Sequence, residues 1–301
     1  MLLGGEWMVN PLNLCERLIQ GWISKNELEN LIDFEYLEKF ASRNSMTIIN
    51  KCDKRGNKSY RIVRMDIPVH FISGDEQNEF SFLDLSDLHI GHPDFKEGLL
   101  RMKLEEATKT GVQYVFIAGD IFEGIQKMMP YEDALATQYR QLDIATKIFK
   151  DYHLNYYAIN GNHDYSFEAF GLHNPIHLLE NNLRREGINF NFFDTYMMDF
   201  IVCGVAKRVM HIEKYKKNKY EPCVIERINR FPDREMIARY EGKQYPIRFF
   251  VCGHIHVNME LYYERKKIYI SQPGSFVQGN EKCERGNFVS GEVLGGKIFR
   301  N

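Results

Sequence analysis

The sequence predicts an α/β domain preceded by a small module of different texture, and three observations lead to this prediction. Four apolar runs of strand length each stop at a glycine-associated turn that carries Asp, Asn or His. Helical patterns separate the first three of these runs, which is the order of βαβ units with right-handed crossovers. Residues 10–66 instead combine short helical patterns with a hairpin pattern. We therefore expect a small domain over 1–66, a linker over 67–79 and the α/β domain over 80–301.

Length and composition narrow the class of protein. A chain of 301 residues with 44% hydrophobic and 27% charged residues can bury a substantial core, as soluble globular proteins do. The net charge of −2 indicates no particular partner, and no apolar stretch approaches the roughly 20 residues that span a bilayer. We see no signal peptide, and the six cysteines lie far apart without a Cys-x-x-Cys pair. We therefore expect a cytoplasmic protein, with no membrane partner, whose cysteines are reduced.

The N-terminal module has the outline of a winged helix. Residues 11–23 read as a helix, Ser24 and Glu27 form a capping box before a second one, and residues 34–42 form a third. Strand patterns at 46–50 and 59–64 then flank a turn. Residues 50–66 hold six Lys or Arg against two Asp, which suits contact with a phosphate backbone. Any exposed hairpin has a similar composition, so nucleic-acid binding and a protein contact or packing role both stay open.

The elements of the α/β domain follow in order along the chain. Three helical patterns alternate with the apolar runs or follow them, at residues 95–110, 131–152 and 176–185. From residue 190 the texture changes to paired strands, and we expect a second sheet built from residues 190–193, 197–210, 259–270 and 288–299.

The ends of the four apolar runs carry the residues that matter for chemistry. Asp87 and His89 are two residues apart, so a strand places them on the same face. The three later runs end in Gly119-Asp120, Gly161-Asn162-His163-Asp164 and Gly253-His254-x-His256. Each pair alone is a weak signal. Four such ends together concentrate the oxygen and nitrogen ligands that a site for two divalent metal ions needs.

These motifs, in this order, resemble those of the calcineurin-like metallophosphoesterase superfamily over Phe80 to Phe276. The Leu-His-Ile-Gly and Gly-Asp-Ile-Phe sequences look closest to the DNA-repair exonuclease type branch. The resemblance implies an αββα sandwich of two sheets with the metals at the strand ends. It also implies which residues bind: Asp87, His89, Asp120 and His256 the first ion, and Asp120, Asn162, His254 and one further histidine the second.

The further histidine must lie between residues 164 and 254, where His173, His177 and His211 are the candidates. The first two stand at the head of a helical pattern, whereas His211 ends a strand-like run, which is where the family has its ligand. We therefore choose His211. It is followed by basic residues, and the stretch 207–219 has six Lys or Arg and one Glu, which could guide a polyanion or be merely solvated.

The resemblance also implies roles beyond metal binding. Asn162 and His163 would contact the substrate phosphate, His163 would protonate the leaving group, and Asp164 would orient the His163 imidazole. His92 follows the first motif and is either a substrate contact or a loop residue without a role. Glu123 stands where many relatives carry Asp, and we expect little consequence from that difference.

The sequence thus predicts a dinuclear metal-dependent phosphoester hydrolase that uses a metal-bridging hydroxide for in-line attack on phosphorus. Two divalent ions are expected, manganese first, with iron or zinc as alternatives. A phosphodiesterase or nuclease acting on DNA or RNA is preferred because of the basic module. A phosphomonoesterase or nucleotide phosphodiesterase, and an inactive nucleic-acid-binding scaffold, remain as alternatives. The oligomeric state is not predicted.

Overall fold

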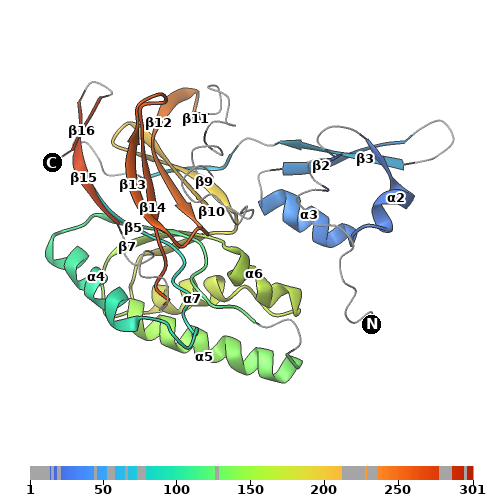
Figure 1. Cartoon of the computed structure of the whole chain (residues 1–301), viewed down its shortest axis with the longest axis horizontal. Helices are drawn as coiled ribbons and strands as arrows, with labels where there is room; N and C mark the ends of the chain where they lie inside the picture. Colours follow the sequence, from blue (N-terminus) through green and yellow to red (C-terminus); the bar gives the residue numbers. More distant parts are fainter. Residues whose placement is uncertain are drawn as a thin grey trace. The chain divides into compact units, whose positions relative to one another are not determined.

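The computed structural model divides the chain into two compact units, Met1–Pro68 and Val69–Asn301. It describes residues 14, 17–18, 22–43, 46–52, 58–64, 67–72, 79–125, 129–211, 228, 236–277, 287–294 and 297–300. Among these residues there is no helix long and apolar enough to cross a membrane. Figure 1 labels helices and strands of both units.

The first unit combines short helices with a three-stranded antiparallel sheet. Its elements in chain order are β1 (Ile23–Ser24), α2 (Lys25–Glu29), α3 (Phe34–Arg43), β2 (Met46–Cys52) and β3 (Lys58–Arg64). The sheet order is β1-β3-β2, because the hairpin partner β3 also pairs with β1. The expected cap is present, since the Ser24 hydroxyl accepts a hydrogen bond from the Glu27 amide at 3.3 Å.

Two details of the first unit bear on its predictions. Ile23, expected at the end of a helix, lies in β1 instead, where it pairs with Tyr60. The basic turn expected over residues 53–58 lies outside the described residues except for Lys58. The winged-helix assignment and its basic surface therefore remain predictions.

A six-stranded sheet carries most of the sequence motifs of the second unit. Its order is β16-β15-β5-β6-β7-β8, with β5 to β8 parallel and β15 antiparallel to β5. The strands are β5 (Glu79–Leu85), β6 (Tyr114–Ala118), β7 (Asn155–Ile159), β8 (Phe190–Phe193), β15 (Asn287–Leu294) and β16 (Lys297–Arg300). Every residue of β6 is buried, as expected for a parallel strand covered on both faces.

A seven-stranded sheet faces it. The order is β13-β14-β12-β10-β9-β4, and β11 pairs with β12 beside this path. The strands are β4 (Val69–Phe71), β9 (Met197–Val202), β10 (Val205–His211), β11 (Ile237–Tyr240), β12 (Lys243–Gly253), β13 (Asn258–Tyr263) and β14 (Ile268–Pro273). Apolar side chains of both sheets meet between them, with Phe80, Phe82 and Phe116 from one sheet against Phe200, Val209 and Phe249 from the other.

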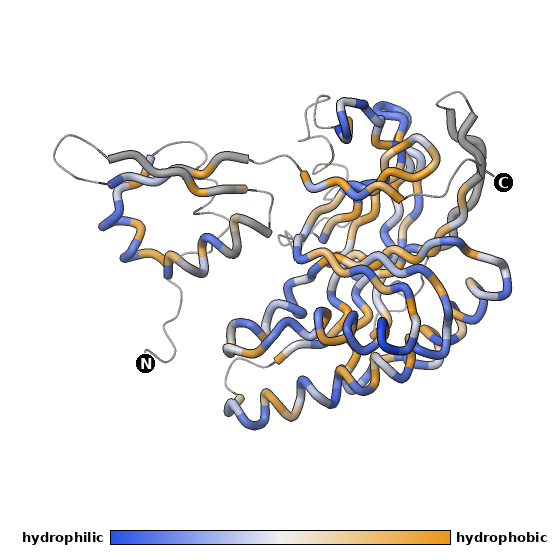
Figure 2. Tube along the Cα trace, turned by 180° about the vertical axis from the view of Figure 1, so that it is seen from behind, coloured by the Kyte–Doolittle hydropathy of each residue, from blue (hydrophilic) through white to orange (hydrophobic). Residues whose placement is uncertain are grey.

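Helices cover the outer face of the six-stranded sheet. They are α4 (Glu97–Lys109), α5 (Tyr131–Phe149), α6 (Asn162–Ala169) and α7 (Pro175–Arg185). Figure 1 shows them together on one side of the unit, and Figure 2 shows helices that alternate between polar and apolar positions beside mainly apolar strands. Their buried residues join one core cluster with Leu83, Val115 and Tyr156 of the sheet. The predicted α/β fold with helices and two sheets is confirmed.

The structure differs from the predicted elements in the strand assignments. Part of the expected linker forms β4, which pairs in parallel with β9. The stretch 197–210 is a hairpin and not one strand, because Cys203 and Gly204 both have positive φ, as a two-residue turn of this kind requires. The strands at 190–193, 287–294 and 297–300 belong to the six-stranded sheet, not to the second one.

Two residues of the basic stretch 207–219, which could either guide a polyanion or be merely solvated, are buried. The Lys207 ammonium lies 2.7 Å from the carboxylate of Asp84 and 3.4 Å from the centre of the Phe82 ring. Arg208 forms a bidentate pair with Asp199. Burial lowers the pKa of Lys207 to about 8. Neither residue can attract a polyanion at the surface, and residues 212–219 of the basic stretch lie outside the described part.

Candidate metal centre

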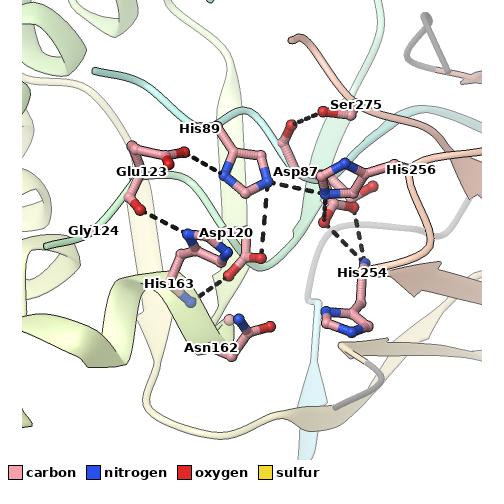
Figure 3. A network of polar contacts seen from close by, with 12 residues as sticks. Asp87, His89, Asp120, Glu123, Gly124, Asn162, His163, His254, His256 and Ser275 are labelled. Carbon is pink, nitrogen blue, oxygen red and sulfur yellow. Dashed lines mark hydrogen bonds and ion pairs between the residues drawn. The ribbon is translucent and has the colours of Figure 1, made fainter. Parts of the chain in front are cut away.

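The predicted ligands meet at one edge of the two sheets. Asp87 and His89 follow β5, and Asp120 follows β6. Asn162 opens α6 just after β7, His211 ends β10, and the remaining two histidines follow β12. The carboxyl ends of parallel strands meet at one edge of a sheet, which brings these separate motifs together. Figure 3 shows the side chains of Asp87, His89, Asp120, Asn162, His163, His254 and His256 converging on a common centre.

The backbone at the candidate ligands is in an uncommon conformation. Eight described residues other than glycine have positive φ, and five of them are predicted ligands. They are Asp87 (51°), His89 (50°), Asp120 (52°), His254 (80°) and His256 (31°). Such conformations cost free energy and persist where the surrounding structure imposes them, commonly at functional sites.

The first cluster of candidate donor atoms consists of Asp87, His89 and His256, whose atoms lie within 4.8 Å of one another. Nε2 of His256 lies 3.3 Å from Asp87 Oδ1 and 3.0 Å from Nε2 of His89. The Asp87 carboxylate also accepts a hydrogen bond from the backbone amide of His254. These three side chains could hold one metal ion.

The second cluster consists of Asp120, His211 and His254, again within 4.8 Å. Nε2 of His211 lies 3.3 Å from Asp120 Oδ2 and 3.0 Å from Asn162 Oδ1. The structure thus brings His211, and neither His173 nor His177, into the donor cluster. A second ion could be held here.

Asp120 belongs to the second cluster and also faces His89 of the first. Its Oδ1 accepts a hydrogen bond from the His163 amide at 2.8 Å. Its Oδ2 is buried and makes no hydrogen bond with any group among the described residues. Ring nitrogens of His211 and His89 face this oxygen at 3.3 Å and 4.0 Å. A buried carboxylate oxygen without a donor, flanked by imidazoles from both clusters, fits a ligand shared by two cations.

Hydrogen bonds on the outer side of the rings decide which nitrogen faces the centre. Nδ1 of His211 lies 2.8 Å from the carbonyl oxygen of Ala118, and Nδ1 of His163 lies 2.6 Å from that of Glu123. A carbonyl oxygen only accepts, so each Nδ1 carries a hydrogen and donates it. Nε2 of each ring is therefore the atom presented to the site.

Burial and neighbouring charges shift the pKa values of three groups at the metal-free site. Burial opposes the charged form of His211, but the carboxylate of Asp120 overcomes it and raises the pKa of His211 to about 10. Burial likewise opposes ionisation of Asp120, yet the charge of His211 holds the pKa of that carboxyl far below its usual range. Burial, together with the nearby His211, lowers the pKa of His254 to about 4. The centre therefore holds an ionised carboxylate, a charged imidazole and a neutral one.

Three glycines leave room for these side chains. A Cβ at Gly253 would overlap the carbonyl oxygen of Ala118 and come within 2.7 Å of His211 Nδ1. A Cβ at Gly119 would lie equally close to that nitrogen, and one at Gly161 would overlap Asp120. The glycine in each motif is thus required by close approach to a neighbouring ligand.

The turn after β14 supports the first motif. Ser275 Oγ donates to the carbonyl oxygen of Asp87 at 3.0 Å, and the Phe276 amide donates to the same oxygen at 3.1 Å. Ser86 Oγ in turn donates to the carbonyl oxygen of Gly274 at 3.0 Å. The turn holds the backbone of Asp87 in place, consistent with a structural role.

Asp164 does not do what the resemblance implied. Its two carboxylate oxygens accept hydrogen bonds from the amides of Phe122 (2.9 Å) and Gly161 (3.0 Å). It stands in the first turn of α6, a helix that the sequence did not predict, and its side chain turns back to cap the helix start. Asp164 therefore fixes two loops of the site, while a backbone carbonyl orients His163.

His92 lies outside both clusters of donor atoms. Its ring is half-buried, and its Nδ1 accepts a hydrogen bond from the amide of Asp94 at 3.0 Å. Its own amide donates to the carbonyl oxygen of His89. The structure therefore places it beside the first motif without a contact that assigns it a role.

Glu123 is the residue whose importance the sequence did not reveal. Its Oε2 lies 2.9 Å from Nδ1 of His89. Figure 3 marks this contact with a dashed line. In the sequence, the one indication of this role was that Glu123 follows the predicted ligand Asp120 by three residues. That spacing does not show that the loop turns the Glu123 side chain towards His89.

Comparison with known proteins gives one family match. The profile described as Calcineurin-like phosphoesterase matches residues 80–258, which is more than half of the chain. No relative is found among curated proteins.

Several solved structures are similar at low identity. They include a predicted phosphoesterase of Streptococcus pneumoniae TIGR4 (14% identity, 74% of this chain and 98% of that chain, TM-score 0.35). They also include a dimetal phosphatase from Danio rerio (10%, 72% and 93%, TM-score 0.41) and Vps29 of Chaetomium thermophilum (13%, 72% and 80%, TM-score 0.35).

Proposed function

The chain belongs to the calcineurin-like phosphoesterase family, and we propose that within it this protein is a dinuclear phosphodiesterase that cleaves nucleic acid. Metal-dependent hydrolysis of phosphoesters is the activity of the family to which it belongs. The observation that carries the proposal of two ions is the pair of donor clusters, in which Asp120 belongs to one and lies 4.0 Å from His89 of the other.

The residues present fit two cations. Asp87, His89, Asp120 and His256 would hold one ion, and Asp120, Asn162, His211 and His254 the other. Oδ2 of Asp120, which makes no hydrogen bond among the described residues, and the inward-facing Nε2 of His211 support this assignment. The donor set of oxygen and imidazole nitrogen without thiolate suits Mn²⁺ first, with Fe or Zn as alternatives. When bound, such ions would polarise the phosphoryl group and activate a water as the nucleophile.

The chain's own residues would orient the substrate and move a proton. His163 donates through Nδ1 to a fixed carbonyl, so its Nε2 faces the substrate, and the doubly protonated ring would give its Nε2 proton to the leaving oxygen. Its amide holds Asp120 Oδ1, which leaves Oδ2 for the cations. Asn162 would contribute its side-chain oxygen and help to place the phosphate. These steps make His163 the general acid of the proposed reaction.

The preference for nucleic acid comes from the N-terminal unit. Its order of helices and strands supports a winged-helix-like module, and the basic residues of 50–66 would suit a phosphate backbone. Contact with a protein partner is the alternative role for this unit.

Hydrolysis of two small substrates tests the proposal. We would measure turnover of bis-p-nitrophenyl phosphate and of p-nitrophenyl phosphate with added Mn²⁺, for wild type and Asp120→Ala. We expect diester turnover by wild type and a loss of at least about 100-fold in the variant, because a ligand shared by both ions is removed. Single- and double-stranded DNA would be tested next, at several salt concentrations, because contact with phosphates weakens as salt rises.

Each other outcome would change the proposal. Turnover of the monoester alone would replace it with a phosphomonoesterase. Turnover of the diester without any cleavage of DNA or RNA would favour a nucleotide phosphodiesterase. No turnover with Mn²⁺, Fe²⁺ or Zn²⁺ would leave a nucleic-acid-binding scaffold as the remaining interpretation.

A further inference from the structure

Glu123 contacts two histidines of the site with two different groups. Its carboxylate Oε2 lies 2.9 Å from Nδ1 of His89, and its backbone oxygen lies 2.6 Å from Nδ1 of His163. The His89 side chain is 3% exposed, whereas the Glu123 side chain is 30% exposed and reaches it from the rim of the site. One residue therefore touches both a proposed metal ligand and the proposed general acid.

The contact with His89 has a definite consequence for that ring. An ionised carboxylate only accepts hydrogen bonds, so Nδ1 of His89 must carry the hydrogen. In the neutral ring the lone pair is then on Nε2, which faces Nε2 of His256 at 3.0 Å and Asp120 Oδ2 at 4.0 Å. The carboxylate thus selects the tautomer and the ring orientation that a metal ligand needs.

The loop that carries Glu123 is held from several sides. Its amide donates to the carbonyl oxygen of Ile90 at 3.1 Å, and the preceding amide of Phe122 donates to Asp164 Oδ1. After it, Gly124 exchanges two hydrogen bonds with the buried side chain of Gln141, and the Ile125 amide donates to Ser166 Oγ. These bonds fix the backbone before a metal arrives, so the carboxylate is preorganised against His89.

Direct coordination by Glu123 is the competing interpretation. Donor atoms of His89, Glu123 and His163 also lie within 4.8 Å of one another. However, Nδ1 of both rings already donates to Glu123, and a cation there would have to displace both hydrogens. The hydrogen-bonded arrangement leaves the inward Nε2 atoms for the ions and needs no such displacement.

We propose that Glu123 is a positioning residue that holds His89 with Nε2 presented to one of the two metal ions. This inference rests on the proposed two-metal function. It assigns the side chain to His89 alone, because the contact with His163 uses the backbone and survives any substitution at residue 123.

Metal binding by the full-length protein tests this inference. We would titrate MnCl₂ into metal-free wild type, Glu123→Ala, Glu123→Gln and a control, Glu105→Ala, by isothermal calorimetry. Glu105 is exposed on α4 and pairs with Lys109, so it matches the charge change away from the site. Thermal unfolding of each metal-free protein would be measured in parallel. The tautomer of His89 would be determined from long-range ¹H–¹⁵N spectra.

We expect Glu123→Ala to weaken one of the two Mn²⁺ sites by about 10–100-fold and to leave the other within about twofold. Glu123→Gln should recover most of this loss, because its amide oxygen still accepts from Nδ1. Metal-free melting temperatures should match wild type, and His89 should lose its single tautomer only in Glu123→Ala. The control should bind both ions as wild type does.

Four outcomes would overturn the inference. Unchanged binding of both ions by Glu123→Ala would remove the role. An equal loss in Glu123→Gln and Glu123→Ala would make Glu123 a ligand. A loss of both ions with a lower melting temperature would indicate a general structural role. Wild type that binds fewer than two ions would remove the premise. Wild type that binds two ions without hydrolysing a diester would instead refute the proposed function alone.

Discussion

His211 shows how a single side chain links folding, charge and metal binding. The carbonyl oxygen of Ala118 accepts from Nδ1 and so fixes the orientation of the ring, and the Asp120 carboxylate keeps the ring charged in the metal-free protein. A cation needs the neutral ring, so it must displace the proton from Nε2. Metal binding at this centre is therefore coupled to the release of a proton.

This coupling predicts the pH dependence of metal binding. Because the pKa of His211 is raised to about 10, the ring is charged at pH 7 to 9, and the apparent affinity of one Mn²⁺ site should rise by about tenfold per pH unit over this range. Calorimetry in two buffers with different heats of ionisation would count the released protons. An affinity independent of pH between 7 and 9 would contradict the prediction, and His211→Gln should abolish the proton release.

The motif glycines act at the level of the strand ends, since Gly253 lets the end of β12 approach the end of β6 closely. A Cβ at Gly253 would overlap the Ala118 carbonyl and press on the His211 ring. Overpacking of this kind costs about 1–3 kcal/mol of the free energy of unfolding. We therefore expect Gly253→Ala to be destabilised by this amount and to bind Mn²⁺ more weakly.

Chemical denaturation with a matched glycine checks this prediction. Gly98 lies in α4 without a positive φ, and a Cβ added there would meet no heavy atom within 4 Å beyond its own helix backbone, among the residues described. Gly98→Ala should be neutral or stabilised by up to about 1 kcal/mol, since alanine favours helices. Equal effects of the two substitutions would show that close packing at Gly253 does not matter.

The strand ends were predictable from the sequence, whereas several strand partners were not. Asp87, Asp120 and His254 each stand at the end of an apolar run, within a short motif. Their position at a strand end can therefore be predicted from neighbouring residues alone. Which sheet a strand joins depends on contacts far along the chain, and the prediction for β8 and β15 is therefore wrong. Glu123 was missed for a similar reason, because its role depends on the path of one loop.

Across the whole molecule, one buried ion pair connects the two sheets. Lys207 of β10 and Asp84 of β5 lie fully buried beside aromatic rings. Lys207 precedes the candidate ligand His211 on β10, and Asp84 precedes Asp87, which follows the end of β5. Removing one partner leaves the other charge buried without compensation. Replacing both with apolar residues avoids that penalty.

These considerations predict different effects for single and double substitutions. Lys207→Met should lower the free energy of unfolding by about 3–5 kcal/mol, and the double variant Asp84→Leu with Lys207→Met should recover most of this loss. Urea denaturation of the metal-free proteins would measure both. A double variant as unstable as Lys207→Met would contradict this prediction. It would show that the ion pair itself stabilises the fold, beyond avoiding an unpaired buried charge.

The pairing of β5 with β15 has a consequence for the order of events during synthesis. β5, which leads into the first motif, is complete by residue 85, but its antiparallel partner begins only at residue 287. Until that segment leaves the ribosome, one edge of β5 has no strand to pair with, and an open edge invites pairing with other chains. The sheet that carries the first three motifs is thus completed only when β15 has been synthesised. A nascent chain that lacks β15 would be the form most prone to aggregate.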